Sequence, residues 1–173
     1  MRALDFWKAV TVDAANLVEV FIRLLETHGI RYCVVGGQAV NAYVEPLVSL
    51  DLDLVIAAEQ FPALEALLSS DFKVERFPHS LNISRPGSDV RIQFQTDPRY
   101  APFVARASRL NVLGLLLPVA RIDDVLQGKS WAAQDRTRRG SKRQKDLADI
   151  ARLVEAYPNL RDQVPAEILQ RLA

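Results

Sequence analysis

The most restrictive feature of the sequence is a strict alternation of leucine and aspartate at residues 50–54. Only a β-strand explains a period of two, because successive side chains of a strand leave opposite faces. The leucines then face the core and fix the register of the strand. Asp51 and Asp53 leave the other face, with their backbones roughly 7 Å apart. Two carboxylates at that spacing repel each other unless a cation lies between them, and Mg²⁺ prefers such oxygen ligands.

A glycine pair, Gly36-Gly37, follows a short predicted strand at residues 31–35 and precedes a predicted helix at residues 38–44. Glycine lets the backbone approach a phosphate closely, and a helix N-terminus presents free amide groups. Taken alone, a glycine pair is most often a turn, and two aspartates on a strand are most often a solvated face. In this order, the two features favour a site for a triphosphate and bound metal ions.

Around this pair the chain alternates helices and short strands. Further helices are predicted at residues 12–25, 61–69, 100–107, 122–133, 142–157 and from about 165 to the end. Strands are predicted at residues 31–35, 50–56, 72–77, 81–84 and 90–95, with a strand pair or extended segment at 111–119. This order predicts an α/β (α+β) fold, in which helices flank a mixed β-sheet. We expect a single domain over residues 1–173, with a core at about 30–120 and a helical tail at about 121–173.

Composition excludes several other classes. The formal net charge is +1, and Cys33 is the only cysteine, so an internal disulfide or a thiolate metal cluster cannot form. The N-terminus carries Arg2, Asp5 and Lys8 among its apolar residues and lacks a signal-peptide core. The longest nearly apolar stretch, residues 110–120, is about half of what a membrane span needs. These features predict a cytoplasmic protein with no membrane partner.

The chain also resembles a known superfamily. Residues 34–39 (VVGGQA) followed by residues 51–54 (DLDL) resemble the signature of the nucleotidyltransferase superfamily, and the most similar groups are the minimal nucleotidyltransferases and the AbiEii-type toxins. Residues 143–150 resemble the R-x-K-D-x-x-D helix that follows the catalytic domain in the toxin-like branch. Lys129 resembles the lysine that precedes that helix. The match spans about residues 30–155.

The resemblance implies a role for each matching residue. Gly36 and Gly37 would hold the nucleotide phosphates, Asp51 and Asp53 would bind a pair of magnesium ions, and Lys129, Lys145 and Asp146 would contact the nucleotide, with Asp149 as a further member. For the helix there is a structural alternative, because Lys145 and Asp149 form an i,i+4 pair of a kind common on exposed helices.

A third carboxylate, which usually acts as the general base in this superfamily, has no obvious match. The strand expected to supply it carries Asp89, Arg91 and Gln93 on one face. Asp89 shares the correct face but lies at the edge of the strand, so it is the candidate catalytic residue beside Asp51 and Asp53. Arg91 would compete with magnesium for these carboxylates or pair with a nucleotide phosphate.

The leading hypothesis is therefore a Mg²⁺-dependent nucleotidyltransferase. It would move a nucleoside monophosphate from a nucleoside triphosphate, such as ATP, to an RNA or protein acceptor, with toxin–antitoxin activity as one version and a cognate antitoxin as partner. The basic residues between 136 and 145 fit an RNA acceptor but also fit a solvated loop. The alternative hypothesis is a catalytically impaired nucleotide-binding or regulatory module, similar to an antitoxin.

Overall fold

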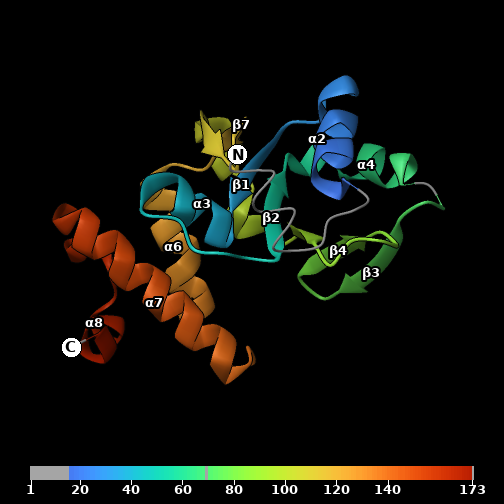
Figure 1. Cartoon of the computed structure of the whole chain (residues 1–173). Coiled ribbons are helices and arrows are strands. Elements are labelled where there is room, and N and C mark those ends of the chain that lie inside the picture. Colours follow the sequence, from blue (N-terminus) through green and yellow to red (C-terminus); the bar gives the residue numbers. More distant parts are fainter. Residues whose placement is uncertain (1–15, 69, 173) are drawn as a thin grey trace.

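A computed structural model describes residues 16–68 and 70–172 as a mixed sheet with helices on both faces (Figure 1). The strands are β1 Tyr32–Val35, β2 Asp51–Ile56, β3 Lys73–Phe77, β4 Ser80–Ser84, β5 Arg91–Gln95, β6 Ser108–Val112 and β7 Leu115–Val119. The helices are α2 Leu17–Thr27, α3 Gly36–Tyr43, α4 Phe61–Leu67, α5 Phe103–Arg106, α6 Ile122–Gln134, α7 Gly140–Ala156 and α8 Ala166–Leu172, with short 3₁₀ turns at Ala58–Gln60, Pro98–Tyr100 and Pro158–Gln163. The predicted fold class is thereby confirmed.

The seven strands are ordered β3-β4-β5-β2-β1-β7-β6. The acidic strand β2 lies near the middle, where it pairs parallel with β5 and antiparallel with β1. On its apolar face Leu52 and Leu54 are fully buried beside Ile92 and Phe94 of β5. Phe21 of α2 packs on Phe94, with ring centroids 5.6 Å apart. The apolar face is thus sealed, and the aspartates are left on the opposite face.

Three helices, α3, α6 and α7, gather on the side of the sheet away from the β3–β4 hairpin (Figure 1). α3 contacts β2, α6 and α7, and α6 and α7 pack against each other. The turn between α6 and α7 is closed by Asp135, whose carboxylate accepts hydrogen bonds from the backbone and hydroxyl of Thr137. Within the described residues, no helix has the length and apolar character that crossing a membrane requires.

The structure differs from the predicted elements in a few places. Instead of one helix at residues 100–107, there is a 3₁₀ turn at Pro98–Tyr100 and the short α5, which Pro102 precedes as its N-cap. The strand pair predicted at residues 111–119 is present as the β6–β7 hairpin, but β6 begins earlier, at Ser108. Its two turn residues, Leu113 and Gly114, both have positive φ, as a tight primed turn requires. Helix α3 begins at Gly36 rather than at residue 38. The start of the predicted helix at residues 12–15 lies outside the described residues.

Candidate active site

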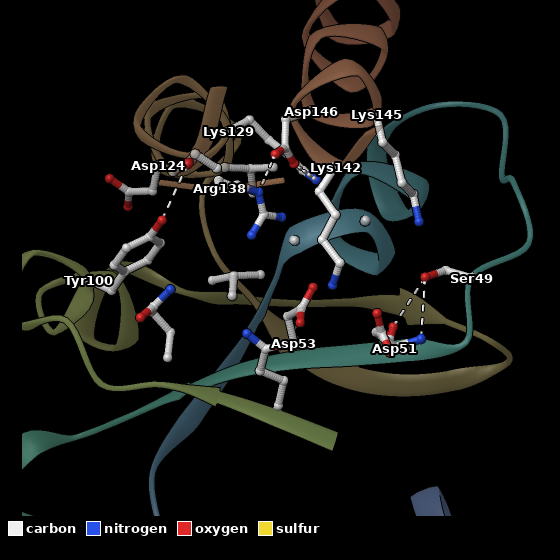
Figure 2. A pocket seen from close by; sticks show the side chains of 18 of the residues that line it. Ser49, Asp51, Asp53, Tyr100, Asp124, Lys129, Arg138, Lys142, Lys145 and Asp146 are labelled. Atoms are coloured by element: carbon white, nitrogen blue, oxygen red, sulfur yellow. Dashed lines mark hydrogen bonds and ion pairs between the residues drawn. The ribbon is translucent and has the colours of Figure 1, made fainter. Parts of the chain in front are cut away.

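A cavity of about 130 Å³ lies where the polar face of β2 meets the three helices (Figure 2). Its floor is formed by Asp51 and Asp53 together with Gln93 and Gln95 of β5. The other lining residues are Val35, Gly36, Gly37, Ser49, Tyr100, Phe103, Asp124, Val125, Gly128, Lys129, Ala132, Arg138, Lys142, Lys145 and Asp146. All of the residues predicted to form the site therefore line one cavity, except Asp89 and Asp149.

Gly36 and Asp53 are in direct contact. A Cβ atom added to Gly36 would lie 2.0 Å from Asp53 Oδ2, and Gly36 has a φ of +65°, which side chains other than glycine rarely adopt. Only glycine at this position lets the first turn of α3 pass over the carboxylate. At Gly37, by contrast, the nearest atom to an added Cβ would be Ser49 Oγ, at 3.8 Å. A side chain would therefore clash with the Asp53 carboxylate at Gly36 but not at Gly37.

Asp53 is a half-buried acid whose surroundings disfavour its charged form. Burial raises the pKa of Asp53 to about 6, and the neighbouring Asp51 adds to the rise, while Lys129, Arg138 and Lys142 oppose it. No described residue forms a hydrogen bond or ion pair with the Asp53 carboxylate. A divalent cation would relieve both the burial and the repulsion between the aspartates. The donor set therefore fits a magnesium ion, which takes one or two protein carboxylates and completes its shell with phosphate and water.

The N-terminus of α3 opens beside these carboxylates. Its first amide groups have no partner within the helix, so they form an anion-binding end. Ser49 holds the start of β2 in place through contacts of 3.4 Å between its hydroxyl and the backbone of Asp51. Gln38, which is buried in α3, donates to the carbonyl of Ser49 at 3.5 Å. The helix end and the acidic strand are thus tied together.

A buried ion network joins α6 to α7. Lys129 Nζ lies 3.0 Å from Asp146 Oδ1 and 2.7 Å from Asp149 Oδ2. Arg138 reaches the second oxygen of Asp146 at 2.7 Å, and Arg152 reaches Asp149 at 2.8 Å. Burial alone would lower the pKa of Lys129, but the two carboxylates outweigh it and raise that pKa. The charges of Lys129 and Asp146 are therefore largely satisfied by each other.

Two further lysines on α7 have different surroundings. Lys142 and Lys145 extend from the helix toward the floor, Lys142 toward Asp53 and Lys145 toward Ser49 (Figure 2). Within the described part of the chain, neither lysine forms an ion pair. The proposed helical pair of Lys145 with Asp149 is not formed, since Asp149 is buried and bound to Lys129 and Arg152. The cavity thus has carboxylates on its floor and free ammonium groups above them.

The third predicted carboxylate lies elsewhere. Asp89 is exposed in the turn before β5 and does not line the cavity. The β5 residues opposite the two aspartates are Arg91, which faces Asp51, and Gln93, which faces Asp53. Among residues 16–68 and 70–172, no group of three or more His, Cys, Asp or Glu side chains could hold a metal ion.

An aromatic wall closes the far end of the cavity. Tyr100 packs edge-on against Trp131 and Phe103, with centroids 5.2 Å apart in both pairs. The hydroxyl of Tyr100 donates to the carbonyl of Gly128 at 3.3 Å, and a Cβ on Gly128 would lie 3.0 Å from the tyrosine ring. The pattern of the sequence did not single out Tyr100, Gly128 or Lys142 as site residues. Only the run of basic residues between 136 and 145 pointed to Lys142.

Comparisons with known proteins place the fold. No protein-family model and no curated protein matches the sequence. Among solved structures, ANT(2'')-Ia in complex with adenylyl-2''-tobramycin superposes with a TM-score of 0.60 at 14% identity, over 91% of this chain and 98% of that one. The lincosamide antibiotic adenylyltransferase LnuA with bound lincomycin gives 0.55 at 13% identity, over 83% and 99%. An antigenic nucleotidyltransferase-like protein from Paracoccidioides brasiliensis gives 0.55 at 22%, over 92% and 85%. The chain therefore has the fold of the nucleotidyltransferase superfamily.

Proposed function

We propose that this protein is a magnesium-dependent nucleotidyltransferase that moves a nucleoside monophosphate from a nucleoside triphosphate to an acceptor hydroxyl. One observation carries the proposal: the Asp53 carboxylate, next to Asp51, lies directly under Gly36 at the start of α3. The candidate metal ligands and the amide end of a helix thus face one cavity. A structural pair of aspartates would not need a glycine with positive φ packed against one of them.

In this proposal each wall of the cavity has its own task. The α3 amide groups at Gly36 and Gly37 and the ammonium groups of Lys142 and Lys145 bind the triphosphate, and Asp51 and Asp53 hold magnesium. The metal ion, when bound, supplies charge that stabilises the phosphate oxygens. The acceptor oxygen attacks the α-phosphorus, the bond to the β-phosphate oxygen breaks, pyrophosphate leaves, and the hydroxyl proton passes to solvent.

The helical tail belongs to this machinery. Because α6 and α7 supply the cationic wall, we propose that the core at residues 30–120 and the tail at residues 121–173 act as one domain. Arg136 and Arg139 are exposed beside this wall, and such residues bind phosphate backbones well. They support RNA as the acceptor, with toxin activity in a toxin–antitoxin pair as the cellular form of the reaction.

The test is transfer of label from each α-³²P nucleoside triphosphate, with Mg²⁺ and bacterial RNA or lysate protein as acceptor. We expect labelled acceptor with the wild type, none with Asp53→Asn, and wild-type labelling with Asp89→Asn, since Asp89 lies outside the cavity. Label transfer by Asp53→Asn at the wild-type rate would refute the proposal.

A second candidate function is nucleotide binding without transfer. One observation favours it: Asp89 lies outside the cavity, and Arg91 and Gln93 stand opposite the two aspartates, so this strand offers no carboxylate as a general base. Under this function, magnesium and triphosphate together raise the melting temperature of the wild type and not of Asp53→Asn, while no acceptor is labelled. Labelled acceptor of any kind excludes it.

A further inference from the structure

Arg91 is paired with one of the two candidate metal ligands. Its Nη2 and Nε atoms lie 3.0 and 3.1 Å from Asp51 Oδ1, across the parallel pairing of β5 with β2. The side chain of Arg91 is 50% exposed and that of Asp51 is 24% exposed. The guanidinium therefore lies on the side of Asp51 that faces β5, and Arg91 is not among the residues that line the cavity.

The strands on both sides of β2 lack a further carboxylate at this level. Gln93 stands opposite Asp53 on β5, and Val35 stands opposite Asp53 on β1. Two divalent ions about 3.5–4 Å apart need carboxylates that bridge them and carboxylates that hold each one. Here one oxygen of Asp51 is already bound to a cation, so only Asp53 and the other oxygen of Asp51 are available.

We propose that the guanidinium of Arg91 takes the place of a second divalent cation at Asp51, so that the site binds one divalent cation with the triphosphate. This inference rests on the proposed metal–nucleotide site. It differs from the resemblance, which implies a pair of magnesium ions, because it assigns one divalent ion to the site. Arg91 supplies a fixed positive charge that is always present, and its planar fork matches a phosphate as well as a carboxylate. The single divalent ion is then held chiefly by Asp53, deeper in the cavity.

The opposing explanation is an ordinary ion pair between neighbouring strands, which a second metal ion displaces. Exposed pairs of this kind contribute little to stability, so they yield readily to a divalent ion. The two explanations differ in the number of ions bound and not in whether the protein turns over.

The experiment counts Mn²⁺ ions bound per chain, by electron paramagnetic resonance of free Mn²⁺, with a stoichiometric non-hydrolysable nucleoside triphosphate. We expect one ion for the wild type and two for the double variant Arg91→Ala/Gln93→Asp, which frees Asp51 and adds a carboxylate opposite Asp53. The double variant should also show the spectrum of two coupled ions. Arg76→Ala, which removes an exposed arginine of β3 paired with Glu65 outside the cavity, should bind one ion as the wild type does.

A second measurement covers the case in which the double variant does not fold. Arg91→Ala alone, without nucleotide, should bind Mn²⁺ about fivefold more tightly, because a competitor for Asp51 is gone. Two ions on the wild type, or unchanged affinity in Arg91→Ala, would overturn the inference while leaving the metal–nucleotide site intact. Absence of any bound Mn²⁺, with or without nucleotide, would overturn the proposed function as well.

Discussion

Asp53→Asn should make the metal-free protein more stable at neutral pH, although it removes a proposed metal ligand. Burial and the charge of Asp51 raise the pKa of Asp53 from 3.8 to about 6. Between pH 3.8 and about 6, Asp53 therefore keeps its proton in the folded protein and loses it in the unfolded chain. A raised pKa contributes stability that is fully present below about pH 4 and is lost as the pH rises through about 6. Above that pH the wild type keeps a partly desolvated charge that asparagine lacks.

The size of the effect follows from the same two values. A rise in pKa from 3.8 to about 6 corresponds to about 3 kcal/mol, at about 1.4 kcal/mol for each pH unit. The free energy of unfolding of Asp53→Asn should thus match that of the wild type near pH 4 and exceed it by up to about 3 kcal/mol at pH 7.5. For a chain of this size, that difference raises the melting temperature by about 6–12 °C.

The assay is urea unfolding in EDTA at several pH values between 4 and 8, followed by circular dichroism. Gln93→Asn is the control, because it changes an uncharged side chain lining the same cavity, so its difference from the wild type should not vary with pH. Mg²⁺ at pH 7.5 should narrow the gap, since the ion binds the wild type only. A gap that stays constant with pH, or a less stable Asp53→Asn at pH 7.5, would refute the reasoning.

Three other predictions concern the walls of the cavity. Gly36→Ala should abolish nucleotide binding and lower the free energy of unfolding by about 1–2 kcal/mol or more, because of the positive φ and the contact with Asp53. Gly37→Ala should have a free energy of unfolding within about 1 kcal/mol of the wild type. Thermal melts and nucleotide titration distinguish the two variants. Lys129→Met should cost about 3–5 kcal/mol, because it leaves two buried carboxylates without their shared partner, and a urea midpoint within error of the wild type would contradict this. Lys145→Met should leave the urea midpoint unchanged but weaken triphosphate binding and reduce its salt dependence, measured by calorimetry at several NaCl concentrations.

The fold was predictable because short-range patterns of apolar and polar residues specify the strands of the sheet. The alternation at residues 50–54 specifies β2 and its buried face, which the structure confirms for fully buried Leu52 and Leu54. The prediction is wrong for Leu50, which precedes β2 and is 45% exposed. Element boundaries were less predictable, as at residues 98–106, where a 3₁₀ turn and the short α5 replace one predicted helix. The hairpin turn at Leu113 and Gly114 illustrates the same limit, because a leucine with positive φ contradicts its intrinsic preference and is held by tertiary context.

For the candidate site, the carboxylates of the floor could be predicted from the sequence, but the roles of the lysines above them could not. Burial decides whether a charged side chain pairs within the protein or is available to a ligand. In the sequence, Lys129, Lys145 and Asp146 cannot be told apart by role, because each is a charged residue on a predicted helix that the resemblance assigns to the nucleotide. In the structure Lys129 and Asp146 lie at the centre of a buried network and satisfy each other. Lys145 is exposed at the cavity and is free to meet an anion.

The same network explains how distant parts of the chain form one site. The carboxylates come from β2 and the free ammonium groups from α7, about 90 residues later in the sequence. The pairs of Lys129 with the α7 carboxylates, and of Arg152 with Asn41 on α3 at 3.0 Å, help to fix the height of α7 above the sheet, together with the packing of α7 on α6. Loss of Lys129 should therefore weaken triphosphate binding by displacing Lys142 and Lys145, and not by removing a direct ligand.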